Sequence, residues 1–352
     1  MVCAALLLVL ASGCKRESIA RINSAQIHQI THQLAKAASD AAPSGTIVTT
    51  RRARGASAGS AADQIYVGLR GGDRAAASVE QSLEGVAAEQ GLTVDPETRS
   101  GNSVKLVLRR HGSVTQRIEI EELAGAAARS TPGAPRLAIL LDDLGSDQNA
   151  ADAIFALHVP LTISVLPYHA HSQEIAEAAH QHGCEVMLHL PMQSVANDSP
   201  EPVELKPGFT AEQVRSTVER MLDAVPQADG VNNHQGSEAT ADAMLMGELM
   251  RVLKDDGVFY VDSRTTAETV AYDTARREGV KTAYRNVPFL DDAQDKNAVK
   301  RQLQTAIAGA KQKGEAITIG HPHAATLEAL REMLPEAKKE GVQLVLVSEL
   351  VH

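Results

Sequence analysis

The sequence predicts an α/β protein: a (β/α) barrel of seven or eight strands, preceded by a small α+β domain. From Arg136 onward, short apolar runs alternate with amphipathic helical patterns, which is typical of parallel strands joined by helices. Seven or eight such units in about 215 residues favour a closed or nearly closed barrel over a doubly wound sheet. No glycine-rich phosphate loop follows any of the apolar runs, which argues against nucleotide binding.

The composition is that of an ordinary globular chain. Its 352 residues are 43% hydrophobic and 22% charged, which leaves room for two or three domains. The formal net charge of −10 argues against a nucleic-acid partner, because such proteins present a basic surface to phosphates. Cys3, Cys14 and Cys184 have no metal-type spacing and imply no disulfide framework.

The first segment, residues 1–14, resembles a lipoprotein-type signal peptide. Residues 2–11 form an apolar run that is too short to span a membrane but suits the apolar part of a secretory signal. The ending Ala11-Ser12-Gly13-Cys14 resembles a bacterial lipobox, whose cysteine is lipidated. A cleaved secretory signal and an uncleaved anchor are the alternatives. All three place the rest of the chain outside the cytoplasm, in the periplasm or at the cell surface, and the first adds a lipid anchor in the membrane.

Two further segments precede the barrel. Residues 15–62 are predicted to hold a helix, because apolar residues recur every three to five positions over 17–42, and a flexible Gly-, Ser-, Ala- and Arg-rich linker at 51–62. Residues 63–123 are predicted to form the small α+β module, with strands at 64–69, 92–95, 104–110 and 114–120 and a helix at 75–90. This module has no cluster of residues suited to chemistry, so we expect a structural or partner-binding role, with an unidentified protein partner. Residues 124–135 are predicted to be a linker.

The barrel is predicted over residues 136–352. Strands are expected at 137–141, 161–166, 185–190, 230–233, 258–261, 280–283, 316–319 and 342–347. Helices are expected between them, for example at 172–182, 211–224, 241–255, 297–313 and 325–339.

Polar side chains gather at the carboxyl ends of these strands, which share one rim in a barrel. They are Asp142 and Asp143, His189 and Gln193, Asn232, Asn233 and His234, Asp262 and Ser263, and His321 and His323. Residues spread over about 180 positions can therefore converge on one pocket. The adjacent carboxylates of Asp142 and Asp143 repel, so one is expected to bind a cation and the other to remain a base. An ordinary helix cap or a pair of solvated turn acids is the alternative.

The segments LLDDLG, CEVMLHLPMQ, GVNNHQGS, FYVDSRT and IGHPH occur in this order and resemble the divergent polysaccharide deacetylase family. This family is a remote branch of the polysaccharide deacetylases, which include chitin and peptidoglycan deacetylases. The resemblance covers residues 136–352 and excludes the N-terminal module. It implies a deacetylase-like barrel and a metal-dependent carbohydrate deacetylase that acts on linear amides.

The resemblance also implies a metal centre. In the wider superfamily an Asp-Asp pair supplies a general base and then a metal ligand, which corresponds to Asp142 and Asp143. A His-x-x-x-His motif supplies two more ligands, and His189 matches the first of them. Gln193 stands at the position of the second, so His234 is expected to replace that ligand. Neutral imidazoles with one carboxylate suit a divalent ion, with Zn²⁺ the best match, and leave a position open for water and substrate.

The remaining roles follow from the same resemblance. The superfamily's late Leu-x-His motif, whose histidine is the general acid, corresponds to Ile319-Gly320-His321, and His323 is the rival for that role. Other residues that could orient ligands, donate to an oxyanion or contact substrate are Asn232, Asn233, Asp262, Ser263 and Gln193. Asp262 could equally be an ordinary acid at a strand end.

Three functions are compatible with these patterns. The first is a metal-dependent hydrolase that removes N-acetyl groups from an envelope or extracellular polysaccharide, with the polysaccharide or an oligosaccharide as its partner. The second is a non-catalytic envelope protein whose barrel binds glycan or a protein. The third is a metal hydrolase for another amide or ester. Aromatic residues make up only 3% of the chain, although sugar rings are commonly held against aromatic faces.

Overall fold

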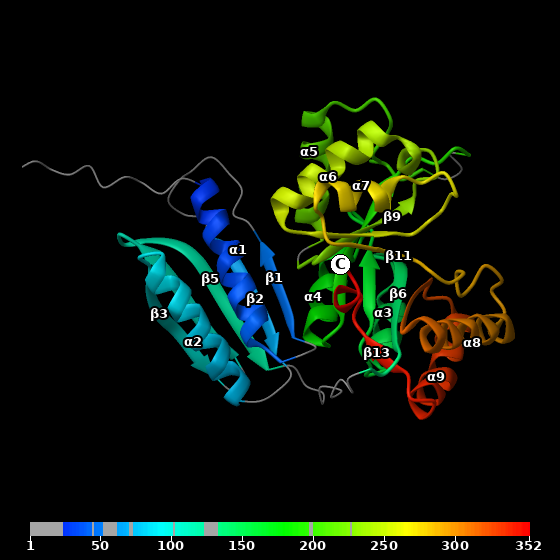
Figure 1. The fold of residues 1–352 in the computed structure, drawn as a ribbon, viewed down its shortest axis with the longest axis horizontal. Helices are drawn as coiled ribbons and strands as arrows, with labels where there is room; N and C mark the ends of the chain where they lie inside the picture. The colour runs from blue at the N-terminus through cyan, green and yellow to red at the C-terminus, as the bar shows by residue number, and fades with distance from the viewer. Residues whose placement is uncertain are drawn as a thin grey trace, which may run out of the picture.

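The fold was analysed in a computed structural model that describes residues 24–43, 46–51, 62–69, 73–100, 103–122, 133–196, 200–225 and 227–352. The predicted signal peptide at 1–14 and most of the predicted linker at 124–135 lie outside these residues. The described chain forms an N-terminal sheet with two helices and a larger C-terminal barrel (Figure 1). None of the described helices is both long enough and apolar enough to cross a membrane.

The N-terminal unit is a five-stranded mixed sheet with two helices on one face (Figure 1). Its strand order is β1-β2-β5-β4-β3, in which only β2 and β5 pair in parallel. The helices contribute Leu34 and Leu83, among others, to an apolar core shared with the strands. The elements are α1 (Ser24–Ala41), β1 (Ile47–Arg51), β2 (Asp63–Leu69), α2 (Asp73–Glu89), β3 (Thr93–Ser100), β4 (Ser103–Arg110) and β5 (Ser113–Glu122).

Helix α1 and strand β1 belong to this unit, although the sequence suggested a separate helix and linker over residues 15–62. Strand β1 pairs with β2 over its whole length, and Ile30, Leu34 and Ala38 of α1 are buried in the shared core. The physical reason is that an amphipathic helix needs cover for its apolar stripe, and the adjacent sheet provides it. The α+β unit therefore begins before residue 63.

The C-terminal half is a nearly closed parallel barrel, as predicted. Its strands run in the order β11-β10-β9-β8-β7-β6-β12, and β13 pairs with the beginning of β6. Between β11 and β12 the gap is bridged by backbone hydrogen bonds from Asn286 to Ile317 and from Leu290 to Ile319. The strands are β6 (Arg136–Leu144), β7 (Thr162–Val165), β8 (Glu185–Met192), β9 (Gly230–Gln235), β10 (Phe259–Asp262), β11 (Thr282–Tyr284), β12 (Glu315–Gly320) and β13 (Gln343–Val345).

Two apolar cores hold the barrel together, one inside the strands and one between the strands and the helices. Leu140, Phe259 and Ile319 belong to the inner core, whereas Leu141 and Tyr260 pack outward. The described helices are α3 (Gln148–Phe155), α4 (Ser172–Gln181), α5 (Ala211–Ala224), α6 (Ala243–Asp256), α7 (Ala271–Glu278), α8 (Lys296–Lys313) and α9 (Ala324–Lys339). The five helices expected from the sequence are present, and α3 and α7 are additional.

Strand β6 ends in a bulge that positions both of its acids. Along this strand Ala138 and Leu140 face the inner core, and Asp142 follows in the same alternation. The pairing of β6 with β7 is irregular between Leu141 and Leu144, and Asp143 has a φ of 62°. A non-glycine residue in this left-handed region is strained, and such bulges re-aim side chains near functional sites. Asp143 can therefore reach the same rim as Asp142, although neighbours in a regular strand point to opposite faces.

Candidate active site

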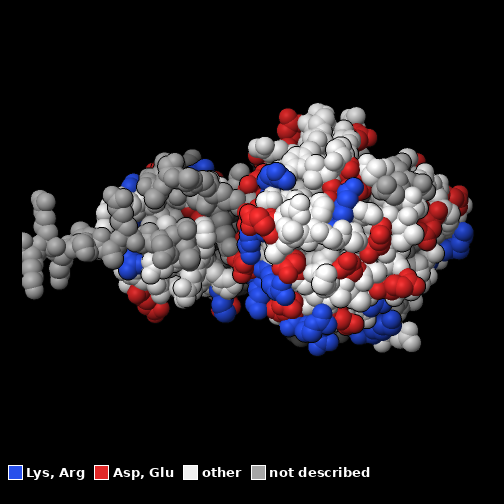
Figure 2. Space-filling model, turned by 90° about the horizontal axis from the view of Figure 1, so that it is seen from above, with Lys and Arg blue, Asp and Glu red and all other residues white. Residues whose placement is uncertain are grey.

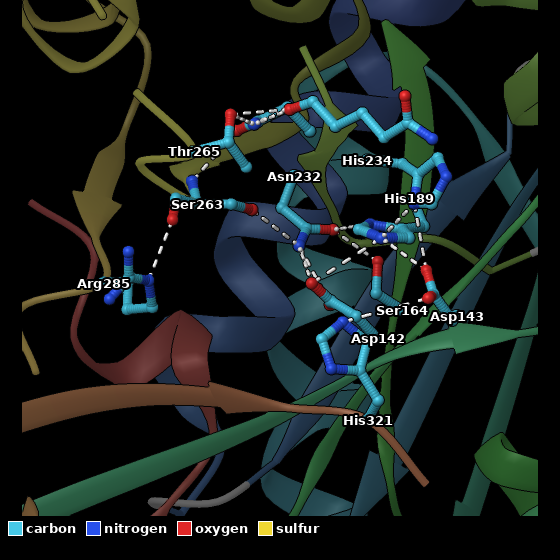
Figure 3. Close-up of polar contacts among 12 residues, drawn as sticks. Asp142, Asp143, Ser164, His189, Asn232, His234, Ser263, Thr265, Arg285 and His321 are labelled. Atoms are coloured by element: carbon cyan, nitrogen blue, oxygen red, sulfur yellow. Dashed lines mark hydrogen bonds and ion pairs between the residues drawn. The ribbon is translucent and has the colours of Figure 1, made fainter. Parts of the chain in front are cut away.

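Three side chains from three strands meet at the carboxyl-terminal rim of the barrel (Figure 3). Asp143 Oδ1 lies 3.1 Å from His189 Nε2 and 3.0 Å from His234 Nδ1, and the two imidazole nitrogens are 3.2 Å apart. Asp143 comes from β6, His189 from β8 and His234 from β9. The structure thus brings together the three residues that the sequence suggested as metal ligands.

This donor set fits a divalent ion such as Zn²⁺. One carboxylate and two imidazoles are the ligands found at catalytic zinc sites, where a fourth position stays open. Ligand atoms at the corners of a zinc tetrahedron are about 3.3 Å apart, given bond lengths of about 2.0–2.1 Å. The separations of 3.0–3.2 Å among Asp143, His189 and His234 are close to that value. The side chain of Asp143 is 38% exposed, so the site opens to solvent.

Asp142 lies beside this set but is held differently. Its carboxylate is buried and accepts hydrogen bonds of 2.9 and 3.0 Å from Asn232 Nδ2, while His189 Nε2 is 3.6 Å away. Burial raises the pKa of Asp142, and this effect outweighs the nearby His189 and His321, which favour the charged form. A carboxylate with a raised pKa and no ligand-type contact is suited to accept a proton.

The pKa of Asp143 moves in the opposite direction. Burial alone would raise it, but the hydrogen bonds and charges of His189 and His234 are stronger and hold the pKa of Asp143 well below its usual range. Asp143 is therefore ionised at neutral pH, as a metal ligand must be. The two adjacent acids differ in environment in the way that two different roles require.

Asn232 connects the base to the donor set. Its Nδ2 donates to Asp142 and, at 3.1 Å, to Ser263 Oγ, so its Oδ1 is the acceptor for Ser164 Oγ and for His189 Nδ1 at 3.0 Å. Because His189 donates from Nδ1, its Nε2 is the nitrogen that faces Asp143 and would bind a metal ion after losing its proton. Asn232 is fully buried, so this orientation is fixed by packing as well as by hydrogen bonds.

His321 reaches the site from the end of β12 and is held by Asp291, which the sequence analysis missed. Asp291 Oδ2 accepts from the backbone N–H of His321 at 2.6 Å and from Thr326 Oγ1 at 2.8 Å, and Oδ1 is 3.0 Å from His321 Nδ1. His321 Nε2 lies 3.8 Å from Asp143 Oδ2. Burial would lower the pKa of His321, but Asp291 and the two acids of β6 outweigh it and raise this pKa to about 9. His321 is therefore a protonated imidazolium at neutral pH.

His323, the rival for the acid role, lies farther from the donor set. It precedes α9, its Nε2 is 3.0 Å from Gln294 Nε2, and its ring centroid is 5.8 Å from that of His321. A donor atom of His323 also lies within 4.8 Å of donor atoms of Asp291 and His321. Since Asp291 is already bonded to His321 and Thr326, we regard this second group as support for His321 rather than as a second metal centre.

Three of the residues suggested by the sequence point elsewhere. Asn233 faces the other side of β9, where its Oδ1 accepts from Tyr260 OH and the Ser263 N–H. Asp262 accepts from the N–H of Arg264 and from Thr269 Oγ1, so it holds the loop after β10 and does not contact His321. The side chain of Gln193 donates to Glu238 Oε2 at 2.6 Å. Ser263 alone among the residues after β10 reaches Asn232.

The fold and the site together define a parallel barrel whose carboxyl-terminal rim carries a metal-type donor set, with Asp142 and His321 beside it. Residues 139–351 match the divergent polysaccharide deacetylase family, and the chain belongs to that family. An uncharacterised protein of Escherichia coli K12, YibQ, is 34% identical over 230 residues, which cover 65% of this chain and 72% of YibQ. An uncharacterised protein of Haemophilus influenzae is 36% identical over 215 residues, 61% of this chain and 76% of that one.

Among solved structures, the uncharacterised protein ATU2773 of Agrobacterium tumefaciens has a similar fold. The two superpose with a TM-score of 0.58 at 22% identity, over 62% of this chain and 89% of ATU2773. At this identity the likeness concerns the fold alone.

Proposed function

We propose that the protein is a metal-dependent N-deacetylase that acts on an acetylated polysaccharide of the cell envelope or the extracellular matrix. The observation that carries the proposal is the arrangement of Asp143, His189 and His234 in mutual contact, flanked by Asp142 and His321. Membership of the deacetylase family supports the reaction class.

Each side chain has a distinct task in this reaction. Asp143, His189 and His234 would hold a divalent ion, which supplies a Lewis acid that polarises the acetyl carbonyl and lowers the pKa of water. Asp142 takes the proton from the attacking water, and Asn232 holds its carboxylate in place. His321 is protonated at neutral pH and gives its proton to the departing amine, while Asp291 keeps its ring oriented.

The test is acetate release from acetylated oligosaccharides by metal-loaded protein, combined with metal content measured by elemental mass spectrometry. We expect about one divalent ion per chain, and acetate release that depends on it. Asp142→Ala should lose activity and keep the ion, whereas Asp143→Ala and His234→Ala should lose both, because only the latter two supply ligand atoms.

Two results would overturn the proposal. A chain that stays metal-free after supplementation with zinc, cobalt or nickel would indicate a glycan- or protein-binding barrel. Equal loss of metal in Asp142→Ala and Asp143→Ala would contradict the assignment of base and ligand. Asp262→Ala is the matched control, since this acid lies at the end of β10 and, among the described residues, its carboxylate bonds only to the loop that follows and to the start of α7.

Export and lipid attachment complete the proposal. The segment 1–14, with its lipobox-like ending at Cys14, supports a lipid-anchored protein of the periplasm or cell surface. Replacing Cys14 by serine should release the protein from the membrane fraction, and an unchanged distribution would contradict the anchor.

A further inference from the structure

Two arginines lie next to the candidate site, at the carboxyl ends of β10 and β11. Arg264 follows Ser263, whose hydroxyl contacts Asn232, and Arg285 follows Tyr284, the last residue of β11. Neither guanidinium has a carboxylate within ion-pair distance among the residues that the structure describes. Figure 2 shows acidic and basic side chains interspersed over one face of the barrel, so acids are plentiful on this molecule.

Arg285 is held rigidly although no carboxylate of a described residue contacts its guanidinium group. Its Nε donates to Ser263 O at 2.9 Å, one terminal nitrogen donates to Val287 O at 2.8 Å and the other to Arg264 O at 2.9 Å (Figure 3 shows the first of these contacts). A guanidinium carries five N–H groups, so these three bonds leave two N–H groups free. The guanidinium carbon lies 3.9 Å from the centre of the Phe289 ring, which in turn stacks on His321.

Arg264 is exposed and is also oriented by an aromatic ring. Its backbone has a φ of 50°, an uncommon conformation for a residue with a side chain, and its guanidinium carbon lies 3.8 Å above the Tyr284 ring. No hydrogen bond from its guanidinium to a described residue is present. Stacking of this kind fixes the plane of the guanidinium group and leaves the N–H groups at its edge available for a planar anion.

Charge and shape favour an anionic ligand over a neutral one here. Burial lowers the pKa of Arg285 and the charge of Arg264 adds to this effect, while the more distant carboxylates of Asp292, Asp262 and Asp142 offset only part of it. A half-buried cation with no carboxylate in direct contact is incompletely paired, and a bound carboxylate would complete the pairing through charge-assisted hydrogen bonds. The rings of Tyr284 and Phe289 are covered by the guanidinium groups, so they cannot stack on sugar at the same faces.

We propose that Arg264 and Arg285 form an anion subsite that binds the carboxylate of an acidic sugar adjacent to the acetylated one. This inference rests on the proposed function and deepens it, because it assigns the substrate to the acidic glycans. Arg285 is linked to the site through Ser263 and Asn232, and it shares Phe289 with His321, so a glycan that places its acetamido group at the donor set runs past both arginines.

The experiment compares two tetrasaccharides that share N-acetylglucosamine. Hyaluronan tetrasaccharide alternates this sugar with glucuronic acid, whereas chitin tetrasaccharide carries no carboxylate. Binding to the full, zinc-supplemented chain is measured by titration calorimetry at low and high salt. We expect hyaluronan to bind at least about tenfold more tightly at low salt, because charge-assisted bonds to arginine are strong and surface charges are screened by salt.

Arg264→Gln should bring the affinity for the acidic sugar to that for chitin and leave the metal content unchanged. Arg276→Gln is the matched control, since Arg276 also lies near an aromatic ring, 5.9 Å from the centre of Tyr272, but on α7. Equal affinities of the two sugars for the wild type, no binding of either sugar, or a preference that survives Arg264→Gln would each overturn the subsite. Acetate release is recorded separately, so a chain that binds the acidic sugar without cleaving it contradicts the deacetylase proposal and leaves the subsite intact.

Discussion

Replacing Asn232 by alanine is predicted to weaken both the fold and the metal site. The change removes the amide that donates to Asp142 and accepts from His189, and it leaves both of those buried groups without this partner. The bonds to Asp142 and His189 contribute about 1.5–3 kcal/mol each and those to Ser164 and Ser263 about 1 kcal/mol each, so the free energy of unfolding should fall by about 5–8 kcal/mol. Metal affinity should fall by about 10- to 100-fold, because the group that orients His189 is lost.

Asn233→Ala is the matched control for this prediction. Asn233 is the next residue, equally buried, and its partners are Gln235 O, Thr265 Oγ1, Tyr260 OH and the Ser263 N–H, none of them charged. Its loss should cost about 2–6 kcal/mol of unfolding free energy, at about 0.5–1.5 kcal/mol for each of the four bonds.

The assay combines urea unfolding of the metal-free chains with zinc titration against a competing chelator. Asn233→Ala should bind zinc as the wild type does, whereas Asn232→Ala should bind it more weakly. If both variants lose stability but neither loses zinc affinity, Asn232 does not orient His189 and the argument is refuted.

Three further predictions follow from the contacts described above. Asp291→Asn should lower the pKa of His321 from about 9, and since the acid must be protonated, the alkaline limb of acetate release should move to lower pH. Burial raises the pKa of Glu185 from 4.5 to about 7, so its ionisation in the fold costs up to about 3 kcal/mol, a penalty that is absent below pH 4.5 and complete above pH 7. Glu185→Gln should therefore raise the free energy of unfolding at about pH 8 and leave it nearly unchanged at about pH 4.5. Gly230→Ala should cost about 1–3 kcal/mol in thermal or urea unfolding, because a Cβ there would overlap the ring of Phe259.

Each of these has an outcome that would contradict it. Asp262→Asn should leave the alkaline limb of the pH profile of acetate release unchanged. If this limb moves equally in Asp262→Asn and Asp291→Asn, Asp291 does not position His321. A gain in Glu185→Gln that does not depend on pH would point to packing rather than ionisation. Gly85→Ala, at a helix position with open space for a Cβ, should stabilise the N-terminal unit by about 0.5–1 kcal/mol, and a loss at both glycines would discredit the steric argument.

Strong periodic patterns made most of the fold predictable. Strands such as β6 and β8 are continuous apolar runs, and helices such as α5 and α8 repeat an apolar stripe over 14 and 18 residues. Helices α3 and α7 have only eight residues each, which is barely two turns and too few for a periodic signal. Strand β1 consists of the β-branched run Ile47-Val48-Thr49-Thr50 before Arg51. Such a run is typical of a strand, so β1 could have been predicted from the sequence.

The site was predictable where strand ends alone decide position. Asp143, His189, His234 and His321 meet because parallel strands end at one rim. The direction of Asn233 follows from the same period of two that places Asn232 inside, so that distinction was also available from the sequence. The role of Asp291 could not be predicted from the sequence, because this residue lies in the irregular segment between β11 and α8, where no pattern indicates which way a side chain points.

The distribution of the donor side chains over β6, β8 and β9 has a consequence for how the barrel comes apart. A bound ion would cross-link positions about 90 residues apart in the chain, and it would do so on one side of the barrel only, because β12 joins the other edge of β6. Removal of the ion should therefore speed amide hydrogen exchange in β8 and β9 while β12 exchanges as before. A bound ion would then stabilise one side of the barrel more than the other.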